Sequence, residues 1–172
     1  MPTPAYIKMT GQTQGVITEG TNTPESVGNT STDKHEDEAL VQAFRHNIMT
    51  PTDPQSGQPS GKVVHGPVII TKVFDKSSPG IYQALTTGER LSEVVIKWYR
   101  TSMDGMQEHY FTHTLIDATI VDITASMPNC QDPGLAHFTH LEDVSMRYRK
   151  IIWEHVVAAT TSEADWRAAY ES

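Results

Sequence analysis

The chain has 172 residues and a formal net charge of −8, with 13 lysines and arginines against 21 aspartates and glutamates. A domain of this length buries about 70% of the surface that its unfolded chain exposes, so a core can form without a metal or disulfide. The single cysteine, Cys130, excludes an intrachain disulfide and fits a reducing compartment. The acidic balance disfavours nucleic acid and anionic membranes as partners, and we expect neither nucleic-acid binding nor membrane insertion.

The first fifteen residues contain no apolar run of the kind that a signal peptide requires, and no later segment is long enough to cross a bilayer. We therefore expect a chain that is made in the cytoplasm. If it is exported, we expect it to be secreted without a cleavable signal peptide.

The N-terminal third combines strands with a polar loop. Residues 5–10, AYIKMT, alternate apolar and polar side chains, the period of a half-buried strand. Residues 18–38 are rich in turn formers and acids, which predicts a loop that could hold a short strand. Residues 40–49 fit a helix or a strand, and we favour the strand.

A long polar connection follows. Residues 51–67, PTDPQSGQPSGKVVHGP, hold four prolines and three glycines. Loops beyond about 12–15 residues without structure of their own are uncommon in compact domains, and are usually functional or disordered. The extended polar loop at 50–66 is therefore a candidate functional segment.

One clear helix is predicted over residues 77–89, SSPGIYQALTTGE. Ser77 or Ser78 suits its N-cap, and Pro79 suits its first turn. Gly88 suits its end. The helix is short and offers one apolar face to a sheet.

The remaining segments favour strands. Aromatic and β-branched runs occupy residues 68–74, 91–101, 107–117, 118–127, 138–150 and 151–159. The Asp104-Gly105 pair is a strong hairpin signal. A short tail from residue 161 carries Trp166, which we expect to dock. These elements suit an antiparallel barrel or sandwich, and we predict a mainly β fold, an antiparallel β-barrel of about eight strands with one short α-helix packed on its side.

His109 and His113 have a spacing that would bring both imidazoles to one ion on a helix. The surrounding aromatic and threonine residues predict a strand, where four residues span about 13 Å, too far to share a zinc ion. We interpret them as paired surface histidines and expect no metal site.

A second charged motif, HEDE, could hold a cation through its carboxylates. Adjacent residues point in different directions, however, and no glycine-punctuated calcium loop surrounds them. We favour a charged interface patch that meets a basic patch on another chain. Its members are His35, Glu36, Asp37 and Glu38.

Cys130 lies in a predicted loop, and a histidine that approached it would make it a nucleophile. Nothing beside it resembles an activated thiol site, so we interpret it as a small apolar filler. The chain has no G-x-S-x-G elbow and no phosphate-cradling glycine loop. We predict no catalytic residues, no cofactor and no enzymatic activity.

Several stretches in order resemble one family: TGQTQGVIT, ESVGN, HEDE, PTDPQSGQPSGKVVHGP, IKWYRT, EHYFTHTLIDATIVDI, MPNCQDP, MRYRKIIWEHVVA and ADWR. The chain is similar over essentially its whole length to the Hcp family, the tube protein of bacterial type VI secretion systems. The family carries an aliphatic and aromatic segment before HEDE, whereas residues 29–34, NTSTDK, are polar here. Whether residues 29–34 form a strand is left open.

The resemblance implies a single domain over residues 1–172 that assembles as a homo-hexameric ring. Rings would stack into a hollow tube that can carry small effectors in its lumen. Partners would be a VgrG-like spike, sheath proteins and baseplate proteins. The resemblance also places the tip of the extended loop between stacked rings. This ring-stacking loop comprises Asp53, Pro54, Gln55, Ser56, Gly57, Gln58, Pro59, Ser60 and Gly61.

Two other classes of function remain open from the residues alone. A free-standing ligand-binding β-barrel would be a monomer with an apolar interior cavity. A hydrolase would use Cys130 or the histidines.

Overall fold

A computed structural model describes residues 3–165 of the chain. Ten strands form one antiparallel sheet: β1 (Ala5–Gly11), β2 (Gly15–Val16), β3 (Ala39–Val41), β4 (Ala43–Arg45), β7 (Val68–Val73), β8 (Arg90–Thr101), β9 (Gln107–Ser126), β10 (Leu141–Arg147), β11 (Lys150–His155) and β12 (Thr160–Asp165). β5 (Ile48–Met49) and β6 (Val64–His65) form a separate ribbon. The helices are α1 (Pro24–Val27), α2 (Ser78–Thr87) and two single-turn 3-10 helices, Gly28–Thr30 and Pro133–Leu135.

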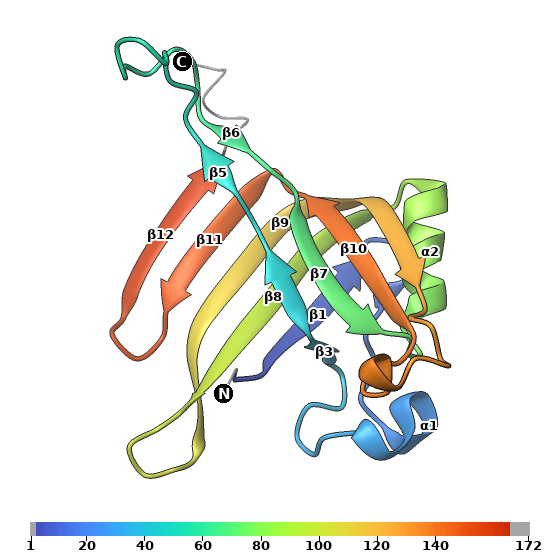
Figure 1. Ribbon diagram of the computed structural model, residues 1–172. Helices are drawn as coiled ribbons and strands as arrows, with labels where there is room; N and C mark the ends of the chain where they lie inside the picture. The colour runs from blue at the N-terminus through green and yellow to red at the C-terminus, as the bar shows by residue number, and fades with distance from the viewer. Residues whose placement is uncertain (1–2, 166–172) are drawn as a thin grey trace.

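The sheet follows the order β2-β1-β8-β9-β10-β7-β4, with β11 paired to β9, β12 to β11 and β3 to β1. It curls around one core, and α2 packs on its side (Figure 1). The mainly β, antiparallel fold is confirmed. The strands outnumber the eight predicted, and among residues 3–165 the hydrogen-bonded path ends at β2 and β4 without closing.

β9 corrects the prediction of two strands at 107–117 and 118–127. It is one strand of 20 residues that passes through Asp117, whose φ is 55°. Aspartate tolerates this left-handed conformation better than most residues. The pairing of β9 with β8 continues on both sides of Asp117, since Leu91 pairs with Ala118 and Glu93 pairs with Ile116. The long strand then serves β8, β10 and β11 as a common partner.

Three further segments test the predictions. Residues 40–49 are strands as favoured, since β3, β4 and β5 lie there. The short strand allowed within residues 18–38 is wrong, because α1 and a 3-10 turn occupy that loop, and residues 29–34 form no strand. The prediction of a tail from residue 161 is also wrong for residues 161–165, because they belong to β12, which pairs with β11 along six residue pairs. Trp166 lies outside the described residues.

α2 confirms the predicted helix and its ends. Pro79 lies in its first turn, and Gly88 ends it in the left-handed conformation at φ 69°. Ser77 occupies the N-cap position but makes no side-chain cap bond. Ile81 and Ala84 are fully buried and hold the helix to the sheet. Full burial of an aliphatic side chain such as Ile81 contributes about 1.5–3 kcal/mol.

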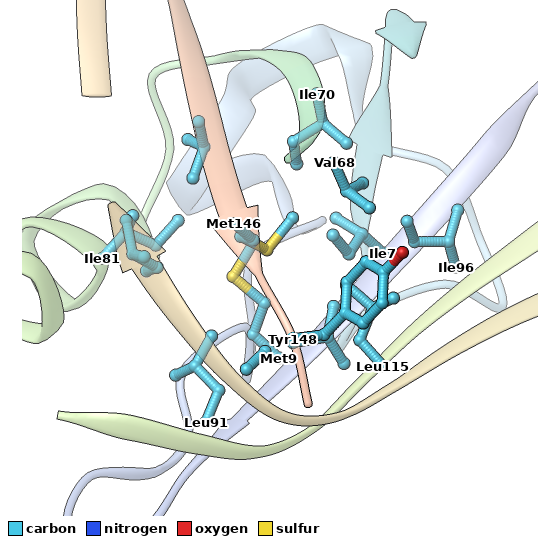
Figure 2. Packing of buried hydrophobic residues seen from close by; sticks show 14 of the residues in the cluster. Ile7, Met9, Val68, Ile70, Ile81, Leu91, Ile96, Leu115, Met146 and Tyr148 are labelled. Atoms are coloured by element: carbon cyan, nitrogen blue, oxygen red, sulfur yellow. The ribbon is translucent and has the colours of Figure 1, made fainter. Parts of the chain in front are cut away.

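Alternating apolar side chains fill the interior of the sheet (Figure 2). Ile7 and Met9 of β1 are fully buried, as the alternation of residues 5–10 predicts, and they meet Ile96 and Met146 in one cluster. Tyr148 also belongs to this cluster. The interior is thus a packed core, which disfavours the ligand-binding barrel with an apolar interior cavity.

Candidate assembly surfaces

The polar loop is an ordered ribbon, which we call the arm and define as residues 48–65. Its two legs are β5 and β6, with Ile48 opposite His65 and Met49 opposite Val64. The arm stands away from the curled sheet at one end of the molecule (Figure 1). A polar segment of this length has therefore become structured without a core of its own.

Backbone hydrogen bonds continue the ribbon to its tip. Asp53 N donates to Gln58 O, Gly57 N to Asp53 O, and Ser60 N to Pro51 O, each at 2.8 Å. The Asp53 carboxylate also accepts from Gln55 N at 2.8 Å, and Gly57 adopts a φ of 72°. Aspartate and glycine are common in tight turns because they satisfy these two requirements. The tip has a defined shape.

The side chains of the arm face outward. All nine residues from 53 to 61 are exposed, so the tip contributes nothing to the core. Nearer the barrel, Met49, Val63 and Val64 are each about half exposed. A cluster of exposed apolar side chains on a protruding element is typical of a protein contact. The arm therefore combines a polar tip with an apolar base.

The HEDE motif is less solvated than an acidic patch would be. His35 is buried, and its ring stacks on Tyr6 with centroids 3.8 Å apart and an interplanar angle of 8°. Tyr99 meets His35 edge-on at 5.1 Å. His35 is thus a packing residue that anchors the loop before β3 on β1 and β8.

The three carboxylates of this motif have different roles. Glu38 pairs with Lys97 at 3.3 Å, and Asp37 Oδ1 accepts a hydrogen bond from Gly20 N at 2.9 Å. Glu36 is exposed. Only Glu36 and the outer part of Asp37 therefore face solvent in a way that suits contact with another chain.

His109 and His113 both lie on β9, as predicted, but they are not simple surface residues. Trp98 Nε1 donates to His113 Nδ1 at 2.9 Å, and His109 Nε2 lies 2.7 Å from Thr112 Oγ1. Burial, and then the charge of His46, lower the pKa of His113 to about 4. No cluster of three metal-binding side chains of His, Cys, Asp or Glu occurs among residues 3–165.

Cys130 is a free thiol on the exposed loop between β9 and β10. The interpretation of this residue as an apolar filler is therefore wrong, because Cys130 is exposed to solvent. Among residues 3–165, Cys130 belongs to neither the buried core nor a cluster of metal-binding side chains.

A buried charge cluster joins β7, β10 and the start of α2, and the sequence reading missed it. Lys72 is fully buried, and its Nζ lies 2.5 Å from Glu142 Oε1 and 3.0 Å from Asp75 Oδ1. Ser78 Oγ donates to Glu142 Oε1 at 2.8 Å, and Ser77 N donates to Asp75 Oδ1 at 2.9 Å. Of the two serines expected to cap α2, Ser78 instead bonds to Glu142 of β10, and Ser77 bonds to Asp75 in the loop before the helix.

A pocket of about 450 Å³ lies outside the packed core, between the α1 segment and the end of β7. Val27, Leu40 and Phe74 contribute apolar surface to it, and Asn22 and His137 contribute polar surface. The pocket brings together none of the predicted site residues.

Comparison with known proteins decides among the remaining interpretations. The model of the family described as "Type VI secretion system effector, Hcp" matches residues 6–155. The "Major exported protein" of Pseudomonas aeruginosa is 60% identical over 168 residues, which cover 98% of each chain. The chain belongs to the Hcp family.

Solved Hcp structures have the same fold. One, described as "Crystal structure of Hcp protein", superposes with a TM-score of 0.93 at 47% identity and covers 96% of this chain and 98% of that chain. The secreted protein Hcp3 from Pseudomonas aeruginosa gives a TM-score of 0.81 at 52% identity, with 96% and 99% covered. Hcp is a tube protein of type VI secretion, and hexameric rings are known for the family. The monomeric ligand-binding alternative is not favoured.

Proposed function

We propose that six copies of this chain close into a ring, that rings stack into a hollow tube, and that the arm joins one ring to the next. The observation that carries this proposal is the arm itself. It is a hydrogen-bonded ribbon whose tip is wholly exposed and which stands away from the core (Figure 1). Because the tip contributes nothing to the core of its own chain, it is available for contact with another copy.

The arm is suited to docking because it is ordered before contact. Association loses free energy when a flexible loop must be fixed, and a preorganised loop avoids much of this loss. The prolines at positions 54 and 59 restrict the unfolded chain and reduce the entropy lost on ordering. The half-exposed Met49, Val63 and Val64 at its base supply apolar area for a neighbouring chain to cover.

Ring closure requires a patch on one copy that meets a different patch on the next. Among the described residues, β12 pairs only with β11 and β4 only with β7, so both present open strand edges that are suited to contact between copies. The HEDE motif adds an acidic contribution through Glu36 and Asp37, which would face a basic patch on the adjacent copy.

The function that follows is mechanical. The chain is made in the cytoplasm, assembles beneath a VgrG-like spike within sheath and baseplate proteins, and is expelled when the sheath contracts, with small effectors in the lumen. It needs no catalytic group, cofactor or metal. None of the helices among residues 3–165 is long and apolar enough to cross a bilayer.

Export by contraction predicts that release depends on the sheath. In the producing bacterium, the chain should accumulate in the medium of the parent strain and fall at least tenfold in a strain that lacks the sheath. A cytoplasmic marker protein measures lysis in both strains. Equal release from the two strains at equal lysis would contradict the proposal.

A further inference from the structure

The strand β12 ends beside the base of the arm. Asp165 lies opposite Lys150 of β11, and its Oδ2 accepts a hydrogen bond from Arg149 Nη1 at 3.3 Å. The end of β12 and the base of the arm lie at the same end of the molecule (Figure 1). Residues 166–172, WRAAYES, therefore begin close to the arm.

The turn from β10 to β11, residues 147–150, connects this point to both legs of the arm. The Tyr148 hydroxyl lies 3.0 Å from Nε2 of His46, just before β5, and 2.6 Å from Nδ1 of His65 in β6. The Tyr148 ring itself is anchored in the core (Figure 2). Arg147 Nη1 donates to the His65 carbonyl at 3.2 Å. Residues 147–150 thus contact both the base of the arm and the end of β12.

The base of the arm presents apolar side chains at its surface. Met49 and Val64 are each about half exposed, and they lie directly opposite one another in the ribbon, so their side chains share one face. Val63, the preceding residue of the same leg, is exposed to a similar extent. An isolated two-stranded ribbon is only marginally stable in water. An apolar partner that covers these side chains would therefore stabilise the arm.

Residues 166–172 match this surface in chemistry and in reach. Two of the seven, Trp166 and Tyr170, are aromatic, and a large aromatic side chain buries about 150–250 Å². Seven extended residues span at most about 23–25 Å, whereas a single turn, residues 147–150, links the end of β12 to the arm. Because the segment begins beside its own arm, its effective concentration there is high, which favours that arm over the arm of another copy.

We propose that residues 166–172 act as a brace, which packs against the base of the arm of the same chain, with Trp166 covering apolar side chains of the ribbon. The brace stabilises the arm in its projecting position. It belongs to the single chain and operates whether or not copies stack. If the proposed ring stacking is correct, loss of the brace would also weaken stacking, a consequence that rests on the proposed function.

Hydrogen exchange tests the brace directly. Amide protection of residues 48–66 would be compared between the full chain and a variant that stops after Asp165, at a dilution at which sedimentation shows no stacked rings. We expect severalfold lower protection of the arm in the shortened chain, because the ribbon loses its apolar cover. Protection in β8 and β9 should not change. Equal protection of the arm in the two chains would overturn the proposal.

Matched variants identify the side chain responsible. Trp166→Ala should reproduce most of the loss of arm protection, whereas Trp166→Phe retains an aromatic ring and should keep most of it. The control Tyr82→Ala removes an exposed aromatic side chain from α2 and should leave the arm unchanged. Parental protection of the arm in Trp166→Ala would contradict the role given to this residue.

Cross-linking shows which arm the segment contacts. In a Cys130→Ser background, Thr50→Cys beside the apolar base and Ala168→Cys in the segment would be treated with a short bis-maleimide. We expect a link within one chain, seen at monomer mass on a denaturing gel. The control pair Met103→Cys and Ala168→Cys, with Met103 in the hairpin between β8 and β9 at the other end of the molecule, should give no such link (Figure 1). A product only between chains, or no product, would overturn the assignment to the same chain.

Discussion

Replacing Lys72 with methionine is expected to lower the free energy of unfolding by about 3–5 kcal/mol, the usual cost of removing one partner from a buried ion pair. Methionine fills a similar volume, so the loss comes from charge and not from a cavity. Glu142 and Asp75 would keep their negative charges without the ammonium group that lies 2.5 and 3.0 Å away. Urea unfolding at a fixed protein concentration measures the change.

A double variant provides the control. Lys72→Met combined with Glu142→Leu removes both charges of the closest pair, and apolar replacement of a whole buried pair is often neutral or stabilising. The double variant should therefore recover part of the stability lost in the single variant, because Glu142 no longer carries an unpaired charge while Asp75 keeps its charge and its hydrogen bonds from Ser77. If Lys72→Met alone costs less than about 1 kcal/mol, the cluster is not the electrostatic anchor of α2 described above.

Replacing residues 53–61 with a short Gly-Ser link is expected to leave the barrel and ring intact and to abolish stacking and secretion. The tip lies wholly outside the core, and a shorter loop changes closure entropy only slowly, so folding should be unaffected. Stacking should fail because the ordered tip, which we propose contacts the next ring, is gone. Electron microscopy counts tubes and single rings, and immunoblotting of the medium measures export.

A length-matched variant distinguishes the shape of the arm from its length. Nine Gly and Ser residues in place of 53–61 keep the reach of the arm but remove both prolines and the Asp53 turn. This variant should stack less than the parent. If the chain with the shortened arm still forms tubes and is exported at parental levels, the arm is not required for stacking or export.

Most of the strands could be predicted because apolar and polar side chains alternate along a strand that has one buried face. Residues 5–10 became β1, and the dense β-branched run at 68–74 became β7. The errors arose where local composition and tertiary pairing disagree. Asp117 resembles a break between strands, yet the ladder with β8 carries β9 through it. Five of the six residues of β12 are polar, and its edge position against β11 cannot be deduced from its own residues.

Among the functional surfaces too, some features could be predicted from composition and others could not. The arm could be found from its prolines and glycines, because composition predicts a long exposed segment. The buried pair left a signal that was not used: Lys72 shares its strand face with Val68 and Ile70, and Glu142 lies opposite it in register. The contacts of the Tyr148 hydroxyl with His46 and His65 left no signal, because Tyr148 lies 102 residues from His46 and 83 from His65. Such contacts exist only after the sheet has formed.

The central claim is that six copies of this chain assemble into a ring. Light scattering coupled to size-exclusion chromatography gives the mass of the purified protein in solution without reference to shape. The proposed ring predicts a species of six times the 19.1 kDa chain mass that persists on dilution to low micromolar concentration. A species of one chain mass at every concentration would contradict it.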